Sequence, residues 1–180
     1  MTLPNALLDR LRRVRLLALD VDGVLTDGRL YFQADGIEIK AFHTQDGHGL
    51  KLLKRVGIHV ALVTGRDSPM VSQRAASLGI DLVHQGCEDK LAILRGLCQR
   101  LDIELEQVAY CGDDLPDLAA IKRCGVGITV PNAPDYMHTH ADWTTERLGG
   151  HGAVREICDT LLEAQGHWSA VLDTYLHGRN

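Results

Sequence analysis

Short apolar runs alternate with amphipathic stretches along most of this chain. The runs have the length and the Val, Leu and Ile content of strands that are buried on both faces of a parallel sheet. They predict strands at 14–19, 58–63, 81–84, 107–111, 126–130 and 141–144. The amphipathic stretches repeat their apolar residues at helical spacing. They predict helices at 5–13, 47–56, 69–78, 88–101, 115–124 and 152–165.

Turn residues support several of these boundaries. Gly57 follows the helix at 47–56 as a stop signal, and Ser68-Pro69 is typical of a helix start, because proline in the first turn loses no hydrogen bond. Ala34-Asp35-Gly36 separates two short strand patterns at 29–32 and 37–42, which is a hairpin signal.

Strands that alternate with single helices favour an α/β fold. We expect a Rossmann-like three-layer αβα sandwich with a mainly parallel sheet and an inserted β-hairpin. The length of 180 residues suits one domain spanning 1–180, with the hairpin at about 29–42 and a C-terminal tail at about 149–180.

Polar side chains gather where these strands end. In a parallel sheet, ligands bind beyond the carboxyl ends of the strands. The residues expected there are carboxylates, a hydroxyl and two cations: Asp20, Asp22, Thr64, Arg66, Lys90, Asp113, Asp114 and Asp117. Several carboxylates stay ionised side by side only with a cation, and a small set of oxygen ligands favours Mg²⁺ over zinc.

The same residues suit phosphoryl transfer. Thr64 and Lys90 would donate to phosphate oxygens. Asp20 would attack phosphorus as a nucleophile, which divides hydrolysis into two easier steps through an aspartyl phosphate. Asp22 would protonate the leaving alcohol and then deprotonate water.

Composition narrows the function classes. The net charge is −5 and aromatic residues make up 4% of the chain, which argues against nucleic-acid binding. No run approaches the roughly 20 apolar residues of a membrane-spanning helix. We see no signal peptide, and the odd number of cysteines, five, favours reduced thiols. We expect a cytoplasmic protein without membrane partners.

Four segments in this order resemble the motifs of the haloacid dehalogenase superfamily: DVDGVLTDG, LVTGR, Lys90 and GDDLPD. The resemblance covers about residues 14–165. Dehalogenases of the superfamily lack the second acid, because a halide leaves without a proton. Asp22 therefore points to phosphoryl transfer.

A closer resemblance is to the family of 3-deoxy-D-manno-octulosonate 8-phosphate (KDO 8-phosphate) phosphatases. It rests on GIEIKAFHTQDGHGLKLL and GGHGAVREICDTLL. It implies Mg²⁺-dependent hydrolysis of KDO 8-phosphate to KDO and phosphate, in lipopolysaccharide precursor biosynthesis. It also implies a homotetramer in which hairpin and tail lie near a neighbour's site. The spacing fits the form without a cap domain.

The resemblance also assigns roles. Asp20 is the nucleophile and Asp22 the acid/base. Mg²⁺ is held by Asp20, the Asp22 carbonyl and Asp113, supported by Asp114 or Asp117. Thr64, Gly65 and Lys90 bind phosphate, and Arg66 reaches the substrate. Residues 149–152 form a mobile tail loop, in which His151 stands where some relatives carry Arg.

Other interpretations stay open. The substrate could be a nine-carbon keto-acid sugar phosphate, or the domain could be a non-catalytic regulator. A receiver domain has its phospho-accepting Asp on a later strand, and phosphomutases or nucleotidases usually carry a lid. Arg66 could form a surface salt bridge and Asp117 could sit in a helical first turn. His138 and His140 are expected in a surface loop, and His43 and His48 at the surface or an interface.

Overall fold

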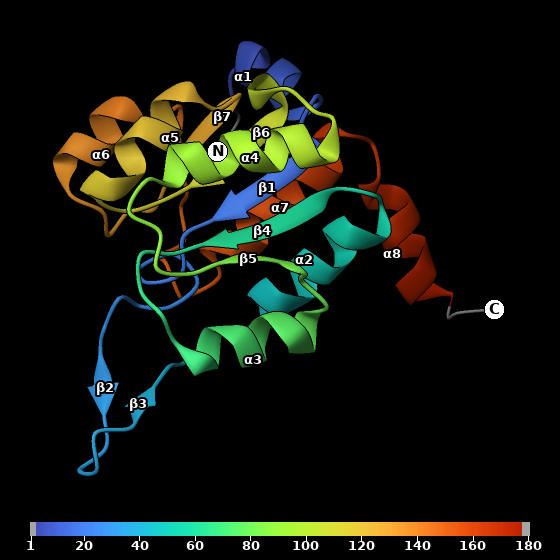
Figure 1. Ribbon diagram of the computed structural model, residues 1–180. Helices are drawn as coiled ribbons and strands as arrows, with labels where there is room; N and C mark the ends of the chain where they lie inside the picture. The colour runs from blue at the N-terminus through green and yellow to red at the C-terminus, as the bar shows by residue number, and fades with distance from the viewer. Residues whose placement is uncertain (1–2, 178–180) are drawn as a thin grey trace.

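The computed structural model describes residues 3–177 and contains a six-stranded sheet with the order β5-β4-β1-β6-β7-β8. All five strand pairings are parallel, which confirms the predicted sheet. The strands are β1 (Leu16–Leu19), β4 (His59–Val63), β5 (Leu82–His84), β6 (Val108–Cys111), β7 (Val126–Thr129) and β8 (Trp143–Thr144) (Figure 1).

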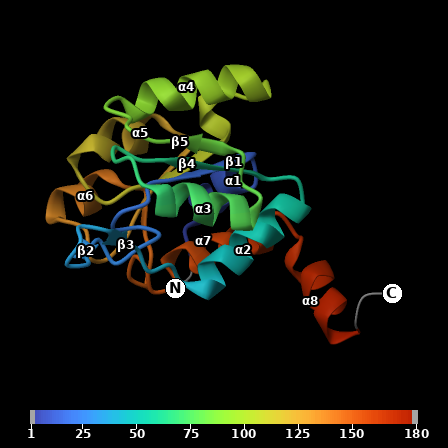
Figure 2. The same cartoon turned by 60° about the horizontal axis from the view of Figure 1, so that its bottom comes forward.

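Helices cover both faces of this sheet (Figure 2). One face carries α4 (Lys90–Leu101) and α5 (Leu118–Arg123), and the other carries α2 (Thr44–Arg55), α3 (Pro69–Leu78) and α7 (Ala153–Ala164). The chain runs from β1 outward through β4 to β5, then returns to β6 and runs outward the other way. Right-handed crossovers place the helices of the two directions on opposite faces. The three-layer αβα prediction is confirmed.

Part of the core lies between the sheet and two closely packed helices, α2 and α7. Every residue of β1 and β6 is buried. The buried face of α7 follows the helical period: Ala153, Val154, Ile157, Cys158, Leu161 and Leu162. This face packs on α2, where a Cβ added to Gly49 would lie only 2.9 Å from Cys158 Cβ. Glycine at this position therefore lets the two helices approach closely.

The hairpin and the last helix lie at opposite ends of the sheet in both views (Figures 1 and 2). The hairpin strands are β2 (Tyr31–Phe32) and β3 (Glu38–Ile39), which are antiparallel and shorter than predicted. The last helix is α8 (Trp168–Leu176). The hairpin exposes large apolar side chains: Leu30, Tyr31, Phe32, Ile37 and Ile39.

Several boundaries differ from the sequence prediction. α2 begins at Thr44 and not at 47, so both of its glycines lie inside the helix. The predicted helix at 115–124 starts as a 3-10 turn, η2 (Leu115–Asp117), before α5. α1 (Asn5–Leu11) lies within the helix predicted at 5–13. The 3-10 turn η1 (Leu105–Gln107), directly before β6, was not predicted.

The prediction of a surface loop around His138 and His140 is wrong, because both residues lie in α6 (Asp135–His140). His138 is partly buried there, and its ring contacts the Ala133 carbonyl at 2.9 Å and the Thr144 hydroxyl at 3.2 Å. The helix has only six residues and buries only Met137 completely, so it lacks the apolar stripe that would have revealed it.

The predicted domain and tail bounds include residues 1–2 and 178–180, which lie outside the part of the chain that the structure describes. Across residues 3–177, no helix has the length and apolar character needed to cross a membrane. All five cysteines are free, and four of them are buried.

The glycine-rich loop at 149–152 packs closely against the turn that follows β1. The Gly150 N–H donates to the Val24 carbonyl (2.9 Å), and the Gly149 N–H donates to Asn132 Oδ1 (2.9 Å). A Cβ added to Gly149 would lie 1.7 Å from the Gly23 carbonyl oxygen. Only glycine permits this approach.

We expect Gly149→Ala to lower the free energy of unfolding by about 1–3 kcal/mol, because the methyl group must displace backbone. Urea unfolding measures the change. Gly96→Ala is the matched control, since Gly96 lies inside α4 with open space around it. That variant should gain up to about 1 kcal/mol from helix propensity. Equal stability of the two variants would contradict the close packing.

Candidate active site

The turn after β1 brings two acids to the carboxyl edge of the sheet. The Asp20 N–H donates to the Cys111 carbonyl (2.9 Å), so Asp20 continues the pairing of β1 with β6. Gly23 then turns the chain with a φ of +91°. A Cβ on Gly23 would lie 2.0 Å from Asp113 Oδ2, so this glycine supplies both the turn and the space for a carboxylate from β6.

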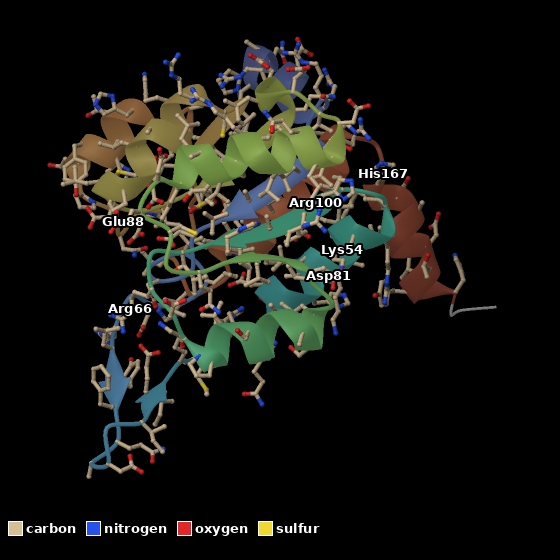
Figure 3. All side chains as sticks on the ribbon, viewed as in Figure 1. Lys54, Arg66, Asp81, Glu88, Arg100 and His167 are labelled. Atoms are coloured by element: carbon tan, nitrogen blue, oxygen red, sulfur yellow. The ribbon has the colours of Figure 1, made fainter. Side chains whose placement is uncertain are left out.

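The predicted site residues surround one cavity of about 220 Å³. Its lining is Asp20, Asp22, Thr64, Gly65, Arg66, Lys90, Asp113, Asp114, Pro116 and Asp117. Figure 3 labels Arg66 at the end of the sheet from which the hairpin projects, far from His167 at the other end. The structure therefore brings together every residue that the sequence nominated. Their individual roles stay predictions.

Lys90 is the buried cation of the cavity and lies between two acids. It is the first residue of α4, whose N-terminus is capped by the Asp89 side chain. Its Nζ lies 3.0 Å from Asp20 Oδ1 and 2.6 Å from Asp117 Oδ1. Burial alone would lower the pKa of Lys90, but the two carboxylates outweigh it and raise that pKa. Lys90 is therefore held as an ammonium ion.

Asp117 is saturated with hydrogen bonds. Its Oδ1 accepts from Lys90 and from the Tyr110 hydroxyl (2.5 Å). Its Oδ2 accepts from the backbone N–H groups of Asp113 (3.0 Å) and Asp114 (3.2 Å). Asp117 is 1% exposed and lies in η2. Asp117 therefore fixes the positions of Lys90 and of the Asp113–Asp114 backbone, a larger role than that of an acid in the first turn of a helix.

Three acids approach closely enough to share a cation: Asp20, Asp113 and Asp117 each offer one oxygen, all within 4.8 Å of one another. Since Asp117 already accepts four hydrogen bonds, Asp20 and Asp113 are the acids with oxygens to spare. The pKa of Asp20 is raised to about 6, mainly by burial and secondly by the negative charge of Asp117, although Lys90 lowers it. Burial and the field of Asp20 raise the pKa of Asp113 to about 7. A hard divalent cation would relieve this repulsion.

The hairpin adds two residues that the sequence analysis missed, Lys40 and Glu38. The Lys40 side chain is 2% exposed and pairs with Asp22 Oδ1, while its Nζ lies 3.5 Å from Glu38 Oε1. Glu38 also accepts from Arg66 Nη2 (2.9 Å) and from the Ser68 hydroxyl (2.8 Å). Glu38 and Lys40 are two positions apart in the segment predicted as a strand at 37–42, where alternation would place them on one face, and this is the one signal that could have indicated them.

The two carboxylate oxygens of Asp22 differ in their hydrogen bonds. Its Oδ1 contacts Lys40. Within residues 3–177, its buried Oδ2 has no hydrogen-bond donor, and Arg66 Nε lies 3.8 Å from it. The second oxygen is therefore the one that could exchange a proton with a bound molecule.

The remaining predicted residues line the mouth and wall of the cavity. Thr64 is buried at the end of β4, and its Oγ1 accepts from the Arg66 N–H (3.3 Å). The Arg66 side chain is 47% exposed. Asp114 lies at the rim, where it accepts from the Tyr136 hydroxyl and from the Leu115 N–H. These hydrogen bonds lower the pKa of Asp114.

Residues 79–157 match the family of haloacid dehalogenase-like hydrolases. The 3-deoxy-D-manno-octulosonate 8-phosphate phosphatase KdsC of Escherichia coli K12 is 45% identical to this chain over 153 residues, which make up 85% of this chain and 81% of KdsC. The chain belongs to the KDO 8-phosphate phosphatase family. The resemblance seen in the motifs and the predicted enzyme class, a phosphoric monoester hydrolase, are thereby confirmed.

Solved structures agree with membership of the KDO 8-phosphate phosphatase family. The enzyme from Moraxella catarrhalis, in complex with magnesium, phosphate and KDO, is 46% identical with a TM-score of 0.93, covering 95% of this chain and 98% of its own. The cobalt-bound enzyme from Haemophilus influenzae is 42% identical with a TM-score of 0.88, covering 93% and 97%. The similarity to these two solved structures thus extends over nearly the full length of this chain and of each relative.

We expect the metal-free protein to lose several kcal/mol of stability as the pH rises from about 4 to about 7. The folded chain keeps protons on Asp20 and Asp113 at pH values where the unfolded chain, with ordinary aspartate pKa values, has released them. Folding is therefore favoured at low pH, and this contribution is lost as the pH rises to about 7. Urea unfolding in a chelating buffer measures it.

Asp113→Asn is the control for this pH dependence, because it removes one of the two raised pKa values. Its stability should change less with pH than that of the wild-type chain, and the comparison cancels contributions from histidines. Added Mg²⁺ should stabilise the wild-type chain more at high pH, since a cation binds the ionised acids. Parallel profiles for variant and wild type would contradict the assignment.

Proposed function

We propose that this chain is a Mg²⁺-dependent phosphatase that hydrolyses KDO 8-phosphate to KDO and phosphate. The observation that carries the proposal is the cavity in which Asp20 and Asp22 face Lys90, Thr64 and Asp113. A relative that is 46% identical holds magnesium, phosphate and KDO. The proposal includes a cytoplasmic location and a role in lipopolysaccharide precursor biosynthesis.

In the first step, a carboxylate oxygen of Asp20 attacks phosphorus and the bond from phosphorus to the sugar oxygen breaks. Asp22 gives its proton to that leaving oxygen through Oδ2, the oxygen without a hydrogen-bond donor in residues 3–177. The product is an aspartyl phosphate on Asp20 and a free sugar alcohol. Lys90, 3.0 Å from Asp20, neutralises charge on the phosphoryl oxygens.

In the second step, Asp22 takes a proton from water, and the water oxygen attacks phosphorus. The bond between phosphorus and the Asp20 oxygen breaks, which releases inorganic phosphate and restores both acids. The hydroxyl of Thr64 and the backbone around Gly65 line the cavity and supply phosphate contacts. Asp22 thus acts as acid and then as base.

The donor set fits Mg²⁺. Asp20 and Asp113 contribute carboxylate oxygens, and the Asp22 backbone carbonyl would complete the protein ligands. Asp117 supports them by holding the N–H groups of Asp113 and Asp114, and Asp114 stands at the rim. When bound, Mg²⁺ supplies positive charge that offsets the negative charge of the transferring group.

Arg66 and the hairpin would read the sugar acid. The Arg66 side chain is half exposed at the cavity mouth, where it could bind the substrate carboxylate. Lys40 and Glu38 hold Asp22 and Arg66 in place from the hairpin. Selection between eight-carbon and nine-carbon acids would depend on this rim, because the phosphate end is common to both.

A homotetramer is part of the proposal. The site is open, and the hairpin carries exposed apolar side chains on both strands, including Phe32 at 60% exposed. A second copy of the chain would cover this surface and exclude water from the reaction. Together with the family resemblance, these exposed side chains support self-association through the hairpin.

Phosphate release from a panel of sugar phosphates tests the function. We expect release from KDO 8-phosphate in Mg²⁺ and none in a chelator, with hexose phosphates and nucleotides far slower. Asp20→Asn should lower turnover by about 10⁴-fold or more, because the nucleophile is lost. Asp102→Asn, the same change at an exposed position after α4, should not affect it. Preference for a nine-carbon acid would replace the substrate, and no release from any compound would favour a regulatory domain.

Light scattering after size exclusion tests the assembly. We expect a tetramer for the wild-type chain and smaller species for Phe32→Asp combined with Ile37→Asp, because two buried charges would oppose docking of the hairpin. Leu176→Asp is the control, since Leu176 is 72% exposed on α8 at the opposite side of the molecule. A monomeric wild-type chain, or a tetramer in the hairpin variant, would contradict this part of the proposal.

A further inference from the structure

A tyrosine hydroxyl is buried in the central sheet beside the site. Tyr110 is 0% exposed in β6, whose other residues are small or aliphatic. Phenylalanine would fill the same space without a polar group, so packing alone does not call for the hydroxyl. The hydroxyl donates to Asp117 Oδ1 at 2.5 Å. No role in the reaction described above falls to Tyr110.

The oxygen that Tyr110 contacts is shared with Lys90. Lys90 Nζ lies 2.6 Å from Asp117 Oδ1 and 3.0 Å from Asp20 Oδ1, so the ammonium lies between two acids that attract it in different directions. The other oxygen of Asp117 is already bound by two backbone N–H groups. Tyr110 therefore competes with Lys90 for one carboxylate oxygen.

We propose that Tyr110 is a positioning residue that keeps Lys90 within reach of Asp20 and of the phosphate. With the hydroxyl present, part of the charge on Asp117 Oδ1 is satisfied by a neutral donor. Without it, Lys90 would be the one remaining donor to that oxygen among residues 3–177, and the ammonium would be drawn toward Asp117. Positive charge would then leave the place where the phosphoryl group gains negative charge.

Tyr110→Phe tests this proposal, whose kinetic part rests on the proposed phosphatase function. We expect kcat to fall about tenfold, which corresponds to about 1.4 kcal/mol of transition-state stabilisation. The Mg²⁺ concentration for half-maximal activity should change less than about twofold, because the Asp117 bonds to the Asp113 and Asp114 amides remain. Tyr175→Phe removes an exposed hydroxyl on α8 and should leave kcat unchanged.

A second readout does not depend on turnover. Calorimetry with inorganic phosphate in saturating Mg²⁺ should show binding weakened about fivefold by Tyr110→Phe, with Mg²⁺ binding itself unchanged. If the wild-type chain hydrolyses no sugar phosphate but binds phosphate with this dependence, the proposed function fails and the role of Tyr110 stands. If phosphate binding is the same in both chains, the role of Tyr110 is wrong.

A double-mutant cycle shows whether the effect passes through Asp117. In an Asp117→Asn background the charge that attracts Lys90 is gone, so adding Tyr110→Phe should weaken phosphate binding by less than about twofold. An equal loss in both backgrounds would overturn the proposal. So would a joint loss of Mg²⁺ binding and melting temperature in Tyr110→Phe, which indicates a structural role. If Asp117→Asn does not fold, the phosphate and Mg²⁺ measurements on Tyr110→Phe decide alone.

Discussion

The repulsion between buried carboxylates at the end of the sheet is the constraint on which this structure depends. Asp20, Asp113 and Asp117 converge within a few ångströms, and Lys90 is the buried ammonium among them. The raised pKa values of Asp20 and Asp113, about 6 and about 7, record that the protein alone leaves these charges under-compensated. The described residues thus leave negative charge at the site uncompensated, and a bound divalent cation would neutralise it.

The sheet topology is what makes this convergence possible. Because β1 lies between β4 and β6, the residues after three adjacent parallel strands meet at one edge. Glycines then remove the side chains that would keep the acids apart. A Cβ on Gly23 would collide with Asp113, and a Cβ on Gly112 would lie 2.3 Å from Asp117 Cγ. The strand order thus directs the acids to one edge of the sheet, and the glycines allow them to lie close together.

The sequence was informative where a local pattern decides the structure. Apolar runs and their polar ends indicated the strands and every cavity residue except Gly65, which the family resemblance supplied, and Pro116. Lys40 and Tyr110 could not be found this way, because their importance arises only when the hairpin folds back onto Asp22 and when β6 lies beside η2. α8 was missed although Trp168, Val171, Leu172, Tyr175 and Leu176 repeat at helical spacing, and it buries no residue completely. Thr44 begins α2 before the apolar period is visible, since the buried residues of its first turn are Asp46 and Gly47 and not large apolar side chains.

The loop at 149–152 has a consequence for synthesis of the protein. It packs on the turn that carries the two acids after β1, so a segment made near the end of translation supports one made near the beginning. Chains emerge from the ribosome at roughly 5–20 residues per second. During that interval the turn after β1 lacks its glycine-loop support, and β1 lacks its partner β6 until residues 108–111 appear. Until then only one edge of the central strand can be paired, by β4, so the growing chain keeps apolar strand surface unpaired for much of its synthesis.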